Sequence, residues 1–103
     1  MSRKGPFLPR KDTAISRSKE ALYSAAWQIG IVVAIQRVRW NLTQVELASD
    51  IGADQIHISQ IETGKPTGMP ESKIDALFAG LDLEGASGQA EFLKWFAKNY
   101  RDL

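Results

Sequence analysis

The stretch from Thr43 to Lys65, TQVELASDIGADQIHISQIETGK, constrains the fold of this chain more than any other segment. Thr43 and Glu46 form a T-x-x-E capping box, which marks the start of a helix. Gly52 stands where that helix has to end, because glycine accepts the positive φ that a helix stop often needs. Asp54 is a suitable N-cap for a second helix. The pattern therefore predicts two short helices joined by a tight turn.

The apolar residues of this stretch recur at helical spacing, which predicts the buried face of each helix. They are Leu47, Ala48 and Ile51 in the first helix, and Ile58 and Ile61 in the second. The other side chains of the second helix are expected on or near its outer face, and these are Gln55, Ile56, Ser59 and Gln60. Gly64 is expected to end this helix.

At these residues the chain resembles the phage-repressor-like (Cro/XRE) helix-turn-helix family of DNA-binding proteins. The family pattern has Gln at the start of the first helix, then a small residue, Gly at the turn, a β-branched core residue and Glu-x-Gly-Lys/Arg. The residues that match it are Gln44, Ala48, Gly52, Ile58, Glu62, Gly64 and Lys65. The resemblance covers residues 33–83 and leaves both flanks outside it.

The resemblance implies an all-α fold, a compact bundle of about five helices with a lambda-repressor-like helix-turn-helix and an N-terminal arm. We expect three parts. They are a basic arm or disordered leader at 1–16, a DNA-binding domain at 17–84, and a C-terminal amphipathic helix at 85–103.

Residues 1–16 contain Gly5, Pro6 and Pro9 among scattered basic groups, which predicts an extended segment without a core of its own. In some helix-turn-helix proteins such an arm enters a minor groove with its Arg and Lys side chains. An arm of that kind and an unstructured leader both stay open.

From Ser16 or Ser18 to Trp40 the apolar residues follow the 3.6-residue period of a helix. The β-branched run IGIVV also fits a strand, and a separate helix over residues 18–28 stays open. Trp27 and Trp40 are expected in the core.

After the two-helix stretch, the sequence predicts a loop over residues 65–70 and then a helix that starts at Pro70 and ends near Gly80. A last helix is predicted from Ser87 to about Tyr100. Its broad aromatic face closes the core, forms a dimer or partner surface, or does both. The residues of that candidate surface are Phe92, Trp95, Phe96 and Tyr100.

Composition narrows the functional classes. The chain has 103 residues, one His and no Cys, and it contains neither a phosphate-cradling Gly loop nor a cluster of metal-ligand residues. We therefore expect one domain that is not an enzyme and that uses no cofactor and no metal. No uninterrupted apolar run approaches the roughly 18 residues of a membrane helix, so no membrane partner and a cytoplasmic location are expected.

Charge is distributed unevenly along the chain. Residues 1–40 hold eight Lys and Arg against two acidic residues, whereas residues 41–103 hold five against ten. A basic N-terminal part suggests a polyanionic partner, although a solvated tail that aids solubility has the same composition.

The resemblance implies that the second helix contacts DNA bases and that residues around the motif contact phosphates. Glutamine pairs a donor with an acceptor and so matches the N6/N7 edge of adenine. The candidate base contacts are Gln55, Ile56, Ser59 and Gln60, of which Ile56 departs from the polar residue usual in the family. The candidate phosphate contacts are Thr43, Gln44, His57, Thr63 and Lys65. Further arm or backbone contacts are expected from Arg3, Lys4, Arg10, Lys11, Arg37 and Arg39.

Three functions are consistent with these features. The first is a sequence-specific transcriptional regulator, a repressor that binds double-stranded DNA as a homodimer. The second is the antitoxin of a toxin–antitoxin pair, which binds a toxin through one flank and represses its own operon. The third is a protein-interaction module that no longer binds DNA, suggested by Ile56 and by the acidic Asp50, Asp54 and Glu62. These three carboxylates are otherwise expected to cap helices or to pair with Arg and Lys.

Overall fold

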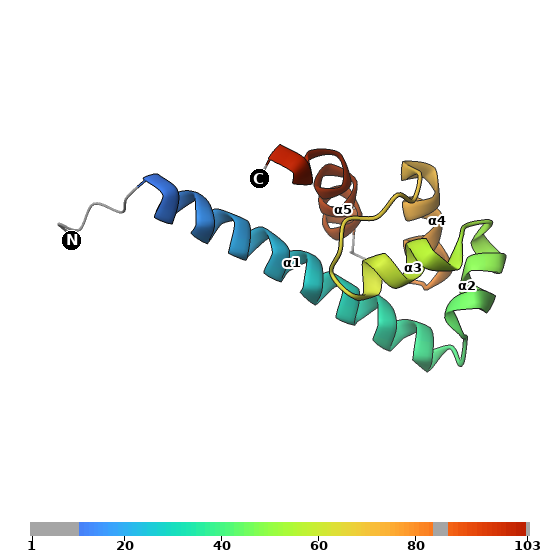
Figure 1. Cartoon of the computed structure of the whole chain (residues 1–103). Coiled ribbons are helices and arrows are strands. Elements are labelled where there is room, and N and C mark those ends of the chain that lie inside the picture. The colour runs from blue at the N-terminus through green and yellow to red at the C-terminus, as the bar shows by residue number, and fades with distance from the viewer. Residues whose placement is uncertain (1–10, 84–86, 103) are drawn as a thin grey trace.

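One long helix, α1, runs along the structure, and four shorter helices gather on one side of its C-terminal half (Figure 1). The computed structural model describes residues 11–83 and 87–102, with the backbone alone for residues 11–18 and Ser87. The elements are α1 (Lys11–Arg39), α2 (Gln44–Ile51), α3 (Gln55–Glu62), α4 (Glu71–Gly80) and α5 (Ser87–Asn99), followed by a 3-10 turn at Tyr100–Asp102. None of the described residues lies in a strand. The prediction of an all-α chain of about five helices is confirmed.

The core lies between α1 and the shorter helices, and all five helices contribute to it. Its buried residues include Ile29 and Val33 of α1, Leu47 and Ala48 of α2, Ile58 and Ile61 of α3, Ile74, Leu77 and Phe78 of α4, and Ala90 and Leu93 of α5. Burying one such aliphatic side chain stabilises the fold by roughly 1.5–3 kcal/mol relative to leaving it exposed. The buried faces predicted for the two helices between Thr43 and Lys65 are therefore confirmed.

The start of α1 corrects the expectation for the N-terminal segment. The helix begins at Lys11, so residues 11–16 are helical and the prediction of an extended arm is wrong for them. The glycine and prolines that suggested an arm all precede Lys11, and no Gly or Pro interrupts the helix before Gly30. Arg3, Lys4 and Arg10 lie outside the described residues. A single helix also replaces the alternatives of a strand and of a separate helix over residues 18–28.

The two tryptophans flanking the C-terminal half of α1 are exposed, so the prediction that they belong to the core is wrong. Trp27 is 51% exposed and Trp40 is 52% exposed. The buried side of α1 carries Ala26, Ile29 and Val33, and Trp27 lies at the edge of that side, against Gly64. The Trp40 indole Nε1 donates a hydrogen bond to the Leu81 carbonyl at 3.1 Å, which fixes its polar edge and leaves much of the ring in solvent.

α3 crosses α1 at Gly30, where the two backbones are in close contact. A Cβ atom placed on Gly30 would lie 2.3 Å from the Ile61 carbonyl oxygen and 2.9 Å from the Glu62 carbonyl carbon. Just beyond the end of α3, Gly64 has φ +72°, and a Cβ there would lie 2.8 Å from the Trp27 Cα. These two glycines allow the C-terminal end of α3 to rest directly on α1, which sets where the rest of α3 projects.

α4 packs against α2, and α5 packs against α4 and α1. Pro70 is the N-cap of α4, and α4 ends at Gly80 as predicted. Lys94 of α5 contacts Asp75 at 2.7 Å, and Lys98 contacts Glu71 at 2.6 Å, so two ion pairs join these helices. The hydrogen bond from Lys98 lowers the pKa of the Glu71 carboxyl below its usual value.

One described helical segment, Lys19–Arg39, is long and apolar enough to cross a membrane by length and composition, and 22% of its most apolar part is buried. The segment meets this criterion on its mean hydropathy, although polar residues interrupt its apolar runs. The expectation that the protein has no membrane partner stays a prediction.

The contact at Gly30 leads to a test of the fold. We expect Gly30→Ala to destabilise the protein by about 1–3 kcal/mol, because the new methyl group meets backbone atoms that cannot rotate away. Urea unfolding followed by circular dichroism measures the change in the free energy of unfolding. Gly88→Ala in α5 is the matched control, since a Cβ there meets nothing within 4 Å. Equal stability of the two variants would contradict the close approach of α3 to α1.

Candidate functional site

The unit formed by α2, its turn and α3 begins with the capping box that the sequence predicts. The Thr43 hydroxyl accepts a hydrogen bond from the Glu46 backbone N–H at 3.0 Å, and the Glu46 carboxylate accepts one from the Thr43 backbone N–H at 2.8 Å. At the other end of α2, Gly52 has φ +68°, in the left-handed region. The start and the stop of α2 are therefore fixed by local interactions.

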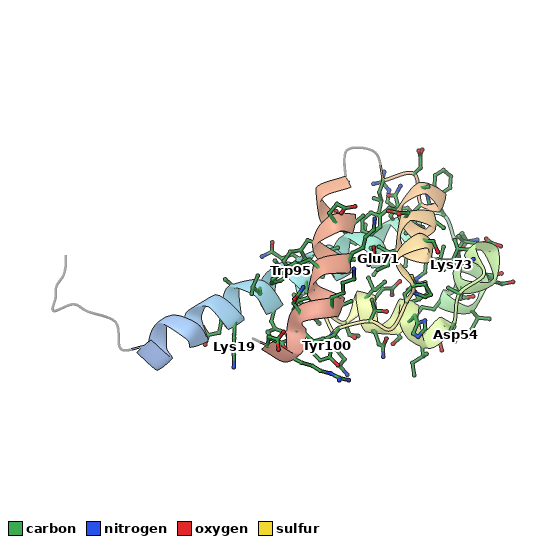
Figure 2. All side chains as sticks on the ribbon, turned by 90° about the horizontal axis from the view of Figure 1, so that it is seen from above. Lys19, Asp54, Glu71, Lys73, Trp95 and Tyr100 are labelled. Atoms are coloured by element: carbon green, nitrogen blue, oxygen red, sulfur yellow. The ribbon has the colours of Figure 1, made fainter. Side chains whose placement is uncertain are left out.

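Asp54 stands at the N-cap position of α3, but its side chain makes no capping hydrogen bond. The expectation that it caps the helix with its carboxylate is therefore wrong. The backbone carbonyl of Asp54 instead accepts a hydrogen bond from the His57 N–H at 3.0 Å. The carboxylate is exposed at the end of the molecule far from Lys19 (Figure 2). Asp50 is exposed as well.

The carboxylate of Glu62 connects α1, α2 and α3 at the base of this unit. It is 5% exposed and accepts hydrogen bonds from Arg37 Nε at 2.7 Å and Arg37 Nη2 at 3.0 Å. Gln44 Nε2 donates a third hydrogen bond to it at 3.0 Å. The expectation that Glu62 pairs with a basic residue is confirmed, and the partner comes from the first helix.

Arg37 is committed to this network, which corrects its assignment as a candidate DNA contact. Besides Glu62, its guanidinium donates a hydrogen bond from Nη1 to the Leu42 carbonyl at 2.7 Å. The hydrogen bond to Glu62 raises the pKa of Arg37 above its usual value, against an opposing effect of burial. The guanidinium therefore stays charged and holds the loop after α1 against the end of α3.

The network continues from Gln44 to the first residue of α3. Gln55 Nε2 donates a hydrogen bond to Gln44 Oε1 at 2.6 Å. Gln44 thus uses its oxygen and one N–H, while Gln55 uses one N–H. A glutamine amide has two N–H donors and one carbonyl acceptor, so Gln55 keeps one donor and its oxygen for another partner. The Glu62 network consequently orients Gln55 as well as the helices.

The outer face of α3 consists of the N-terminal residues and one edge of the helix. Gln55 and Ile56 are exposed, and Ser59 is half-buried. Ile56 is 60% exposed, which places an apolar side chain in solvent beside a polar amide. Thr63 is exposed, but its hydroxyl donates to the Ser59 carbonyl at 2.8 Å and so serves the end of the helix.

The opposite edge of α3 faces the loop over residues 65–70. Gln60 Oε1 accepts a hydrogen bond from the Gly68 N–H at 3.1 Å, which leaves the amide N–H groups of Gln60 as donors. The Thr67 hydroxyl donates to the His57 carbonyl at 3.3 Å, and His57 is half-buried next to Gly68. His57 and Gln60 are therefore less available to a partner than Gln55.

An open hollow of about 430 Å³ separates this loop from the end of α5. Gln60 lies on one side of it, and Lys98, Tyr100 and Arg101 lie on the other. The Arg101 guanidinium lies 5.7 Å from the centre of the Tyr100 ring. Sequence reasoning missed Lys98 and Arg101, because nothing local indicates that the end of α5 returns to α3. The only sequence feature that pointed to these two residues was the basic character of the last turns of α5.

The remaining candidate contacts are spread over the surface. Lys65 and Arg39 are exposed, and Arg39 lies at the end of α1. Lys11 is the first residue of α1, and nothing is described of its side chain. The structure therefore brings together Thr43, Gln44 and Gln55, and Arg37 of α1 joins them through the Glu62 carboxylate.

The aromatic face of α5 is divided between the core and the surface. Phe96 is 1% exposed, so its assignment to an exposed partner surface is wrong. It meets Tyr23 of α1 edge to face at 5.2 Å and stacks on Phe92 at 5.7 Å between ring centres. Trp95 is exposed, while Phe92 and Tyr100 are half-buried. Phe96 thus closes the core against α1, which is the core-closing role that the sequence analysis offered for this helix.

The described residues contain no group of three or more His, Cys, Asp or Glu side chains that could hold a metal ion.

The buried network predicts a large effect of one substitution. Glu62→Ala should lower the free energy of unfolding by about 3 kcal/mol, because it leaves the Arg37 guanidinium partly buried without its carboxylate. Glu91→Ala is a control, since the Lys94 that it contacts keeps Asp75 as a second partner. Chemical unfolding of both variants provides the comparison. A Glu62→Ala protein as stable as the Glu91→Ala protein would disprove the role of the network.

Comparisons with protein-family models, with curated proteins and with solved structures gave no match to this chain. The site consists of a two-helix unit held by a buried carboxylate, with an exposed glutamine at the start of its second helix.

Proposed function

We propose that this protein is a sequence-specific DNA-binding regulator that contacts bases in the major groove with α3 and represses transcription. We also propose that it is located in the cytoplasm. The observation that carries the proposal is the uncovered outer face of α3, on which Gln55 is held by Gln44 with a free donor and a free acceptor. The Cro/XRE-like spacing of residues along α2 and α3 supports the same function.

Gln55 is the residue that specifies sequence in this proposal. A glutamine amide with one N–H and its oxygen free forms a pair of hydrogen bonds with the N7 and N6 atoms of adenine. Fixing the amide in advance through Gln44 reduces the rotamer freedom that binding has to remove. Ile56 next to it is apolar and exposed, which suits contact with a thymine methyl group.

Phosphate contacts are proposed on both sides of this face. At the start of α2, Gln44 keeps one amide N–H, and the backbone N–H groups of a helix N-terminus favour an anion. On the other side, Lys65 is exposed and Arg101 borders the hollow next to Gln60, whereas Lys98 borders it but is paired with Glu71. The exposed carboxylates of Asp50 and Asp54 repel phosphates, so they belong outside the path of the DNA backbone.

Selection of bound sequences from random DNA tests the proposal directly. We expect an enriched motif, and we expect Gln55→Ala to weaken binding to it by about 1–3 kcal/mol while relaxing the preference at one base position. Gln28→Ala is the matched control, because Gln28 is an exposed glutamine on α1 whose only described hydrogen bond is a 3.5 Å contact with Ser24. A protein that enriches no sequence at low salt is not a DNA-binding regulator, and binding to a protein instead would favour the interaction-module hypothesis.

Lys65 should show the opposite pattern to Gln55. Lys65→Ala is expected to weaken binding to all sequences alike and to reduce the slope of log K against log salt by about one, as for the loss of one phosphate contact. Titrations at several salt concentrations with a selected and an unrelated duplex measure both effects. A change confined to the selected duplex would assign Lys65 to base recognition and refute the phosphate contact.

A further inference from the structure

The open hollow between the loop over residues 65–70 and the end of α5 joins two parts of the chain that are far apart in sequence. One wall comes from Gln60 of α3 and from the loop, and the other comes from α5 and the turn that follows it. Figure 2 shows Tyr100 at this end of α5. The volume of about 430 Å³ lies within the range of roughly 300–1,000 Å³ that is typical of small-molecule sites.

We propose that this hollow binds a small aromatic carboxylate, and that such a ligand acts as an effector of the protein. An aromatic carboxylate combines a flat apolar ring with an ionised group that accepts hydrogen bonds and donates none. The apolar part of the lining consists of the Pro66 ring, the Ala97 methyl group and the Tyr100 ring, which suit the ring of the ligand.

The polar side chains from α3 and the loop offer donors to the hollow, because their acceptors are already used. Gln60 Oε1 accepts a hydrogen bond from the Gly68 N–H at 3.1 Å, and no described hydrogen bond uses the two amide N–H groups of Gln60. The Thr67 hydroxyl donates to the His57 carbonyl at 3.3 Å and accepts from the Met69 N–H at 3.1 Å. A ligand that only accepts hydrogen bonds therefore fits this wall.

The opposite wall supplies charged donors from the end of α5. Arg101 Nε donates to the Tyr100 hydroxyl at 3.2 Å, and no described hydrogen bond uses the two Nη groups. These two groups match the two oxygens of a carboxylate, because a guanidinium and a carboxylate are both planar and form paired hydrogen bonds. Lys98 adds an ammonium group, which contacts Glu71 at 2.6 Å and has three N–H donors in all.

The charge around the hollow suits a ligand with a single negative charge. The described lining includes Lys98 and Arg101 and no acidic residue, and Asp102 lies outside it. Because Glu71 pairs with Lys98, one of the two positive charges is left for a ligand. The smaller hollow at the turn between α2 and α3 differs, since its lining includes the carboxylate of Asp54.

Gln60 and Arg101 connect the hollow to DNA binding. Gln60 belongs to α3, and Arg101 borders the hollow as a proposed phosphate contact. A carboxylate that takes their N–H donors competes with DNA for the same groups, so the ligand should weaken DNA binding. This consequence alone rests on the proposed function, because the fit of the ligand depends on the lining of the hollow and not on DNA.

Titration of the full chain with 2-naphthoate, followed by proton–nitrogen NMR without DNA, tests the site. We expect saturating shifts of the Gly68 backbone signal and the Gln60 side-chain signals, with a dissociation constant of about 1 mM or lower for a ligand of this size. Acetate and the neutral 2-naphthalenemethanol should each bind about tenfold more weakly, because each lacks one part of the ligand. Equal binding of 2-naphthalenemethanol, or no shift at Gly68 and Gln60, overturns the proposal.

A substitution at Arg101 tests the carboxylate contact. Arg101→Gln should raise the dissociation constant for 2-naphthoate by about fivefold or more, because it removes the guanidinium. Arg39→Gln is the matched control, since Arg39 is an exposed arginine that lines a different hollow beside the exposed Trp40. Circular dichroism establishes that both variants keep their helices. If Arg101→Gln binds 2-naphthoate as tightly as Arg39→Gln does, the hollow is not the carboxylate site.

DNA binding with and without the ligand tests the effector role separately. Saturating 2-naphthoate should lower the affinity for the selected duplex by about fivefold, measured against sodium acetate at the same ionic strength. A protein that binds 2-naphthoate in the hollow but binds no DNA supports the site and refutes the proposed function. Unchanged DNA affinity with the ligand bound refutes the effector role.

Discussion

The structure depends on one buried carboxylate, that of Glu62. Three helices meet at this group, since Arg37 arrives from α1, Gln44 from α2, and Glu62 itself belongs to the last turn of α3. A buried charge of this kind is tolerated only when its hydrogen-bonding capacity is filled. The orientation of α3 on α1 is therefore tied to the same atoms that orient Gln44 and, through it, Gln55.

The glycines at positions 30 and 64 make that arrangement sterically feasible. Glu62 reaches Arg37 because the end of α3 rests on the backbone of α1, and Gly30 leaves room for the Ile61 carbonyl. Gly64 then turns the chain away over Trp27 in a left-handed conformation. Electrostatic pairing and backbone contact thus act at the same place, and both favour a single angle between α1 and α3.

The sequence predicts the local parts of this structure well and the long-range parts poorly. The capping box at Thr43 and the glycine at position 52 define α2, because their signals lie within a few residues of the helix ends. The exposure of Trp27 and the burial of Phe96 depend on which side of α1 the other helices cover, which no local pattern encodes. For the same reason, Lys98 and Arg101 beside Gln60 were not anticipated. Asp54 is a good capping residue whose carboxylate is not used.

α3 is held at three positions along one uninterrupted helix, and this restricts how α1 can change in length. Inserting one residue between Trp27 and Gly30 would rotate the contact of Gly64 with Trp27 by about 100° relative to the contact of Ile61 with Gly30. An insertion of seven residues would nearly restore the rotation but would separate the two contacts by about 10 Å along the axis. The span from Trp27 to Arg37 therefore has to keep its length if α3 is to keep both glycine contacts and the ion pair at Glu62.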